Sequence, residues 1–284
     1  MFGGLLASAI AKMDGVHGYH AWRWVFILEG IVTIIIGMLA FPLLTDFPDD
    51  ASWLTQEEKN FVIARAGTDR EEAEPITIRR ILSFLADFKN LMGGLMYFGA
   101  FSYFGPTIVK TLGYSTVETQ LHTVPPFAAA FAMCLITAYF SDHLRLRLPF
   151  IGFGVVLTIA GLATLMTVHH HFHTQYAALF LVAMGTFSAG PVVICWYVMN
   201  LRGHTERSIG TAWMISFGNC GGIISTFAFL AKDAPLYHTG YSICLAMVCL
   251  GALAAAVYGG LVLNDNRTGR ISGGGKDERE YYAL

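Results

Sequence analysis

Seven apolar segments limit what this chain can fold into. A helix that crosses a bilayer needs roughly 20 consecutive, mostly apolar residues, and six of the segments come close to or exceed that length. The seventh is shorter and opens on two prolines, which a helix tolerates in its first turn. In chain order the segments are Trp24–Leu44, Leu91–Val109, Val124–Phe140, Phe150–Val168, Tyr176–Met199, Ile209–Leu230 and Tyr241–Leu263. This pattern predicts an all-α polytopic membrane protein.

The composition points the same way. Hydrophobic residues make up 55% of the 284-residue chain and charged residues only 13%, whereas soluble globular chains have about 25% charged residues. The formal net charge of −2 gives no electrostatic basis for binding nucleic acid. Intrinsic disorder needs low hydrophobicity and high net charge, and this chain has neither. We therefore expect an integral membrane protein that has the lipid bilayer as a partner.

The basic residues divide unequally between the two sides of the apolar segments. Fourteen of the 18 Lys and Arg residues fall on one side and four on the other. Because cytoplasmic loops are enriched in Lys and Arg, the polar segment 45–90 and the C-terminus are predicted to be cytoplasmic.

The polar segment 47–90 is interpreted as a cytoplasmic linker with two short helices. The first is expected to begin at a capping box formed by Thr55 and Glu58 and to end at Gly67. The second follows Pro75 and has an amphipathic pattern typical of a helix on the anionic inner leaflet; a solvated linker also explains most of its composition. Its apolar positions are Ile76, Ile81, Phe84 and Leu85, beside the basic residues Arg79, Arg80 and Lys89.

Glu29 is the one ionisable residue within the apolar segments, and it lies near the predicted outer end of the first. Ionisable groups are costly in lipid, which makes Glu29 a candidate for proton coupling or gating in a transport path. The alternative is a structural carboxyl group that hydrogen-bonds to a neighbouring helix.

Polar and aromatic side chains recur in the later segments at helical spacing. Transporters build cavities from such groups and from broken helices, and Gly190-Pro191 offers a place for a break. Close packing through small residues is the alternative, and it explains Gly218 and Gly222 better. The candidate substrate-binding residues are Tyr97, Phe101, Ser188, Trp196, Asn200 and Asn219.

Four histidines stand together in the run His-His-His-Phe-His at residues 169–173. Imidazole is a good ligand for Zn and Cu, but a membrane di-iron enzyme needs several such boxes, and this run stands alone on the predicted outer side. We interpret it as a polar loop and predict no metal site, no cofactor and no enzyme activity.

Several motifs follow one another along the chain: Ala21–Gly30, Ser52–Lys59, Gly105–Lys110, Leu112–Ser115, Thr123–Pro126, Gly218–Gly222, Asp233–Pro235 and Thr239-Gly240. In this order they resemble the major facilitator superfamily of transporters, and within it the fungal allantoate permease group of the anion:cation symporters. The resemblance covers about residues 1–265. In addition, Tyr139–Arg145 stands where the second copy of the family's Asp-Arg cytoplasmic turn belongs, with His143 in place of the usual Arg.

The resemblance implies a domain organisation. Residues 1–46 match the end of helix five and helix six, 47–90 a cytoplasmic linker, and 91–263 helices seven to twelve as a six-helix bundle. Residues 264–284 are expected to form a disordered cytoplasmic tail, and the first four helices of the family are not matched. The resemblance also implies a cytoplasmic gate at Asp142, Arg145 and Arg147, and a central cavity lined by helices seven and ten, which hold Tyr97, Phe101, Ser188, Trp196 and Asn200.

The resemblance further implies that the full-length protein carries a small organic anion, such as an allantoate-like compound, a vitamin or a monocarboxylate. Transport would be inward with protons, by alternating access, through a monomer in the plasma membrane. We expect this chain alone not to transport. The alternatives are a truncated membrane protein that serves as a scaffold or receptor, and a membrane-embedded metal enzyme.

Overall fold

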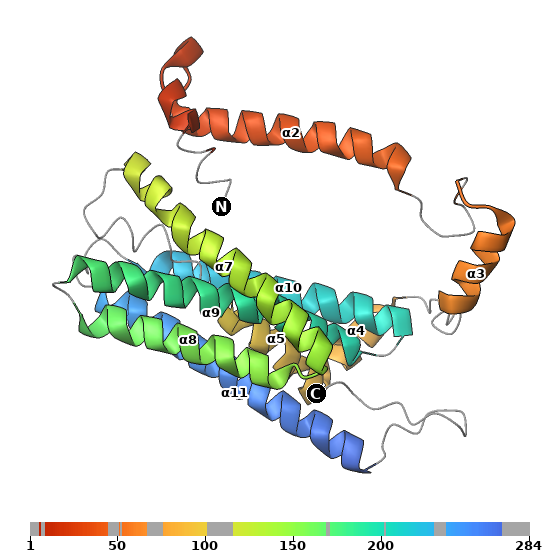
Figure 1. Ribbon diagram of the computed structural model, residues 1–284. Helices are drawn as coiled ribbons and strands as arrows, with labels where there is room; N and C mark the ends of the chain where they lie inside the picture. The colour runs from red at the N-terminus through yellow and green to blue at the C-terminus, as the bar shows by residue number, and fades with distance from the viewer. Residues whose placement is uncertain are drawn as a thin grey trace. The chain divides into compact units, whose positions relative to one another are not determined.

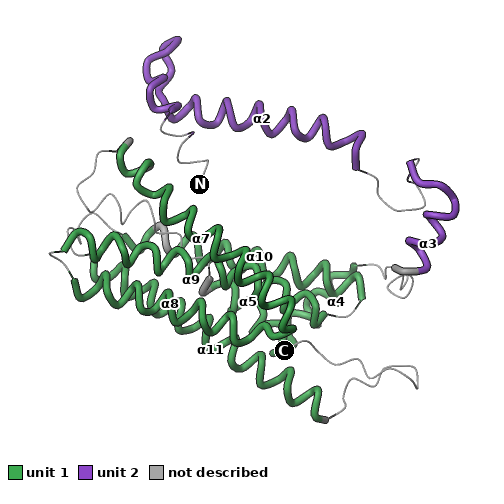
Figure 2. The backbone as a smooth tube through the Cα atoms, viewed as in Figure 1, with its two compact units in different colours: residues 1, 75–284 green, residues 2–74 purple. Residues whose placement is uncertain are grey.

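The computed structural model of this chain contains helices and turns, and no strand, over the residues that it describes, as predicted. Two compact units make up the chain: one holds residues 2–74 and the other holds residue 1 and residues 75–284 (Figure 2). The predicted domain limits stay predictions. The described residues are 6, 9–44, 51, 53–66, 76–100, 116–168, 171–201, 203–229 and 237–268.

The smaller unit is built around one long apolar helix. Its described elements are η1 (Ala11–Met13), η2 (Val16–Gly18), α2 (Ala21–Leu43) and α3 (Gln56–Ala66). The Asp14 carboxylate accepts a hydrogen bond from the Ala21 N–H at 2.7 Å, and this bond satisfies one of the free donors at the start of α2. Helix α2 is long and apolar enough to cross a membrane, which confirms the prediction for Trp24–Leu44.

Helix α3 begins at the predicted capping box. The Thr55 N–H and hydroxyl donate to Glu58 Oε2 at 2.9 and 2.8 Å, and the Glu58 N–H donates to Thr55 Oγ1 at 3.4 Å. These hydrogen bonds from the Thr55 backbone and side chain hold the pKa of Glu58 below its usual range. The helix ends at Ala66, beside the predicted stop at Gly67.

We predict that the first turn of α3 loses protection in acid. Because the pKa of Glu58 is lowered, the stabilisation by its carboxylate is present above the ordinary pKa and is lost as the pH falls through the lowered value. Hydrogen exchange of the Glu58 and Lys59 amides, corrected for the intrinsic pH dependence, should be faster in acid than at neutral pH in the unmodified chain. In the Thr55→Ala variant, exchange at these two amides should already be fast at neutral pH. Equal protection at pH 7 and pH 3 in the unmodified chain would contradict this.

The larger unit is a helical bundle (Figure 1). Helix α9 packs against both α7 and α8, while α5 packs against α9, α10 and α11. Because α11 also packs against α8, the helices enclose a common core around α5 and α9. The described helices of this unit are α4 (Ile78–Ala86), α5 (Phe88–Ala100), α7 (Thr116–Leu144), α8 (Leu148–Thr167), α9 (Phe172–Met199), α10 (Gly203–Ala228) and α11 (His238–Thr268).

Most of the predicted apolar segments are confirmed as spans. Together with α2, the four helices α7, α8, α9 and α11 are long and apolar enough to cross a membrane, which makes five in the described part of the chain. Helix α10 covers most of Ile209–Leu230 but is less apolar, because it carries several Ser, Thr, Gly and Asn residues. Only the first part of Leu91–Val109 is described, as α5.

The structure differs from the sequence-based expectation at three places. Helix α7 does not start at Pro125-Pro126 but at Thr116, and it runs through both prolines; likewise α9 runs unbroken through Pro191. Proline removes one helical hydrogen bond, and neighbouring helices in a membrane bundle tolerate that loss. Helix α11 continues to Thr268, so residues 264–268 are helical and do not belong to a disordered tail; residues 269–284 lie outside the described part.

Aromatic rings rest on glycines at the contacts of α5. The Tyr197 ring of α9 covers Gly93, and the Trp213 ring of α10 covers Gly94. In the reverse direction the Tyr97 ring of α5 covers Gly218 of α10. A Cβ atom at any of these three glycines would overlap the ring, because it would come closer than van der Waals contact allows. Glycine is therefore what lets the helices approach this closely.

We predict that Gly93→Ala destabilises the bundle by about 1–3 kcal/mol, because the added methyl group must displace the buried Tyr197 ring. The measurement is the thermal unfolding midpoint of the purified chain in detergent. Gly260→Ala is the matched control, since a Cβ atom there meets nothing within 4 Å. Equal unfolding midpoints for the two variants would refute the proposed role of Gly93.

Candidate functional site

Three of the predicted substrate-binding residues lie inside the bundle. Ser188 and Trp196 of α9 are 0% exposed, and Asn200, directly after α9, is 4% exposed. The Ser188 hydroxyl donates to the Gly185 carbonyl at 3.1 Å within its own helix. Trp196 packs edge-on against the ring of Tyr258, with ring centroids 5.0 Å apart. These side chains face other helices and do not open onto a surface.

Two other predicted residues, Tyr97 of α5 and Asn219 of α10, are exposed at least in part within the described bundle. Tyr97 is partly exposed, and its ring lies against Gly218. Asn219, the next residue of α10, is exposed. The remaining predicted residue, Phe101, lies outside the described residues.

The exposed side of α10 forms a continuous stripe around Asn219, which we call the α10 face. Ser216 and Asn219 are its polar members. They stand three residues apart and are therefore neighbours on the same side of the helix. A wall of aromatic rings borders it, since Trp213 and Phe217 lie 4.9 Å apart and Phe217 and Phe98 lie 5.3 Å apart. The exposed residues of the α10 face are Ala212, Ile215, Ser216, Asn219, Cys220 and Ile223.

Glu29 is exposed within the smaller unit, along an otherwise apolar stretch of α2. Its backbone carbonyl accepts a hydrogen bond from the Thr33 hydroxyl at 2.7 Å. Among the described residues, no hydrogen bond or ion pair engages its carboxylate, and its assignment to proton coupling stays a prediction.

The predicted gate residues surround the turn between α7 and α8. Arg147 forms an ion pair with Asp142, and its guanidinium also donates to the Ser141 hydroxyl at 3.0 Å. The same guanidinium lies 3.7 Å from the sulfur of Met199, so it connects this turn to the end of α9. Arg145, in contrast, is exposed and has a φ of 54°, in the left-handed region that glycine favours.

A second polar cluster lies at the start of α5, and no sequence pattern predicts it, because its members are single polar residues far apart in the chain. The Asn90 side-chain amide donates to the Phe84 carbonyl at 3.1 Å and accepts from the Tyr197 hydroxyl at 3.4 Å, while the Asn90 carbonyl accepts from the Trp213 indole N–H at 3.2 Å. Next to it, Lys89 pairs with Asp265 at 3.1 Å. This cluster joins five helices at one end of the bundle.

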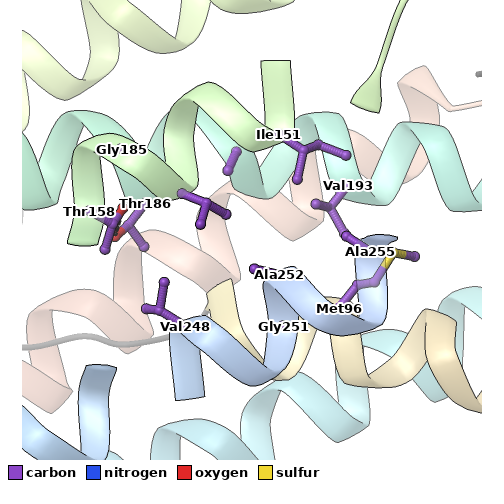
Figure 3. A pocket seen from close by; sticks show the side chains of 12 residues that line it. Met96, Ile151, Thr158, Gly185, Thr186, Val193, Val248, Gly251, Ala252 and Ala255 are labelled. Carbon is purple, nitrogen blue, oxygen red and sulfur yellow. Dashed lines mark hydrogen bonds between the residues drawn. The ribbon is translucent and has the colours of Figure 1, made fainter. Parts of the chain in front are cut away.

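A small cavity lies between α5, α8, α9 and α11 (Figure 3). Its volume is about 30 Å³, which is room for a water molecule but not for an organic anion. Most of its lining is apolar; the hydroxyl groups of Thr158 and Thr186 lie 3.5 Å apart at one end. We therefore do not assign substrate binding to this cavity.

The histidine run is described only in part. His169 and His170 lie outside the described residues, and His171 and His173 are exposed. Over the described part of the chain, no three His, Cys, Asp or Glu residues are grouped so that they could hold a metal ion.

Comparison with known proteins identifies the family. A family model described as Major Facilitator Superfamily matches residues 1–226. The chain belongs to the major facilitator superfamily. With five apolar spans among its described residues, this superfamily member is an integral membrane protein.

The relatives are fungal. The MFS-type transporter cnsO of Penicillium expansum is 30% identical to this chain over 90% of the chain and 53% of its own length. The major facilitator-type transporter hxnP of Emericella nidulans is 30% identical over 83% of this chain and 50% of its own length. The high-affinity nicotinic acid transporter of Saccharomyces cerevisiae is 28% identical over 86% of this chain and 47% of its own length. The chain thus spans about half the length of these curated relatives.

We predict opposite effects for the two arginines of the α7–α8 turn. Arg147→Met removes an ion pair and a hydrogen bond from a side chain that is only 11% exposed, and should destabilise the bundle by about 1–3 kcal/mol. Arg145→Gly relieves the left-handed conformation and should stabilise it by about 1 kcal/mol. Thermal unfolding in detergent measures both; a loss of stability in Arg145→Gly would show that its side chain has a structural role.

Proposed function

We propose that this superfamily member forms the substrate-binding half of a secondary transporter for a small organic anion. The observation that carries the proposal is that the partly exposed Tyr97 packs on Gly218 of α10, next to the α10 face, where Ser216 and Asn219 offer hydrogen-bond donors on an otherwise apolar open surface. Phe101 follows Tyr97 at helical spacing and is proposed to extend this site. We leave Ser188, Trp196 and Asn200 out of it, because their side chains are buried.

Neutral donors suit a carboxylate at this site. The Tyr97 and Ser216 hydroxyls and the Asn219 amide can each donate to an anionic oxygen, and hydrogen bonds to a charged group contribute about 1.5–3 kcal/mol each. The resemblance to the allantoate permease group supports an organic anion as the substrate. So does the name of one relative, a nicotinic acid transporter, because nicotinic acid bears a carboxyl group.

Proton coupling is proposed to involve Glu29. A carboxyl group along an apolar helix of membrane-spanning length is costly in lipid, which makes it a functional candidate. A carboxyl group that binds and releases a proton as its surroundings change from lipid to water would couple substrate movement to a proton gradient.

The orientation proposed for the bundle follows from its basic residues. Every Lys and Arg of the bundle's described residues lies at the end where α5 begins and α11 ends. The positive-inside rule places this end in the cytoplasm. We propose a plasma-membrane location, a cytoplasmic C-terminus and a monomer that works by alternating access.

The test is uptake by a chimera in which this chain replaces the matching half of the yeast nicotinic acid transporter, expressed in a permease-deficient cell. Labelled nicotinate and allantoate are the probes, each with and without an imposed pH gradient. Uptake of either anion that depends on the gradient supports the proposed function. Uptake of neither, by a chimera shown to reach the plasma membrane, contradicts it.

We predict that Asn219→Ala lowers the uptake rate at subsaturating substrate at least tenfold. The expected loss is that of one hydrogen bond to a charged group, about 1.5–3 kcal/mol, and each 1.4 kcal/mol is a factor of ten. Cys249→Ala is the control, because Cys249 is an exposed residue of another helix, α11, and lies outside the α10 face. Equal uptake by the two variants would remove Asn219 from the site while leaving the transport function itself intact.

A further inference from the structure

Helix α4 has an apolar surface wider than the bundle covers. Phe84 is 8% exposed and belongs to the bundle core, and Ile81 and Leu85 pack against the same core. Ile78 and Leu82, however, are 76% and 62% exposed. At 3.6 residues per turn, these five positions form one continuous apolar arc of about 160°. The core covers one part of that arc and leaves the other part open.

The rest of the α4 circumference is polar. Arg79 and Ser83 are exposed next to the open apolar side, and Arg80 lies between them and the core side. The helix therefore has three sides in sequence: a core side at Phe84, an open apolar side at Ile78 and Leu82, and a polar side. A solvated linker helix needs no open apolar side, whereas a helix at a membrane surface does.

Contacts on the core side fix the rotation of α4. The Asn90 amide donates to the Phe84 carbonyl at 3.1 Å, and the Phe84 ring reaches the position of Gly210 on α10. Asp87 separates α4 from α5 with an extended backbone, φ −72° and ψ 122°, so α4 is not a continuation of α5. Ile78 and Leu82 consequently cannot turn into the core without breaking these contacts.

The end of the bundle that holds α4 is basic. The ion pair between Lys89 and Asp265 brings the start of α5 to the end of α11, and the Arg207 guanidinium, at the start of α10, donates to the Leu201 carbonyl just after α9 at 3.1 Å. The Lys and Arg residues of the bundle's described part are Arg79, Arg80, Lys89, Arg145, Arg147, Arg207 and Arg267, and all of them belong to this end. A surface of this charge is complementary to anionic lipid headgroups.

We propose that α4 lies in the headgroup region of the bilayer as a lipid-binding helix. Ile78 and Leu82 enter the upper acyl chains, and Arg79 binds the phosphate of an anionic phospholipid. The proposed occupant is lipid, because the apolar arc lies beside arginines on a helix that a span-bearing bundle holds in place. This proposal is independent of the transport proposal, so the result of its test does not depend on whether the protein transports a substrate.

The experiment compares two added tryptophans on α4, Leu82→Trp and Ser83→Trp, in the purified chain reconstituted into phosphatidylcholine nanodiscs. Both positions are exposed, so neither change disturbs the core. The emission of the unsubstituted chain is subtracted, and quenching is measured with lipids brominated high in the acyl chain and with aqueous iodide. We expect brominated lipid to quench Trp at position 82 at least threefold more than at position 83, and iodide to show the reverse order.

The charge part is tested by replacing 30% of the lipid with phosphatidylserine. This should increase the quenching of Leu82→Trp by brominated lipid, and the added Arg79→Gln change should abolish the increase, whereas Arg145→Gln, a change at an exposed arginine outside α4, should keep it. Equal iodide quenching at both positions would place the helix in water. Protection of position 82 from both quenchers would mean that protein covers it. Either result overturns the proposal, and an anionic increase that survives Arg79→Gln removes Arg79 from it.

Discussion

The close approach of α5 to its neighbours is the contact on which the bundle depends. Gly93 and Gly94 present no side chain, so the Tyr197 and Trp213 rings lie directly on the α5 backbone. Without a hydrophobic drive between helices in lipid, such van der Waals contact is the main source of association. The two rings also donate hydrogen bonds to the side chain and backbone of Asn90, one turn earlier. Packing and hydrogen bonding thus act on the same two side chains.

This arrangement extends to the end of the bundle. Asn90 is 8% exposed, and a buried amide without partners would be costly, so its three hydrogen bonds hold the start of α5, the end of α4 and two further helices in one geometry. The ion pair of Lys89 with Asp265 adds α11 beside it. A bundle tied in this way is expected to move as a rigid body when the surfaces around it rearrange.

Patterns among neighbouring residues were sufficient to predict most of the helices. The candidate site depends on contacts between residues far apart in the sequence, and no local pattern predicts those contacts. The capping box at Thr55 and the apolar spans depend on residues close in sequence, and the capping box and five of the seven spans are confirmed in the described part of the chain. Asn90 and Tyr197 are 107 residues apart, so no spacing rule could join them. Trp196 is assigned to a cavity by helical spacing and by the family resemblance, but neither says which side of α9 the bundle covers, and the side chain is fully buried. The same ambiguity applies to Pro125, whose place inside α7 depends on neighbouring helices.

Adjacent residues of α10 divide between the core and the open surface. Gly218 receives the Tyr97 ring, whereas Asn219 points to the exposed stripe, because consecutive residues of a helix differ by about 100° in direction. The position of the Asn219 amide is therefore set by the packing of its neighbour. Tyr97 belongs to both the core and the open surface, because its ring lies against Gly218 while its side chain is partly exposed. A ligand on the α10 face would contact a wall whose geometry the core has already determined, and such preorganisation lowers the cost of binding.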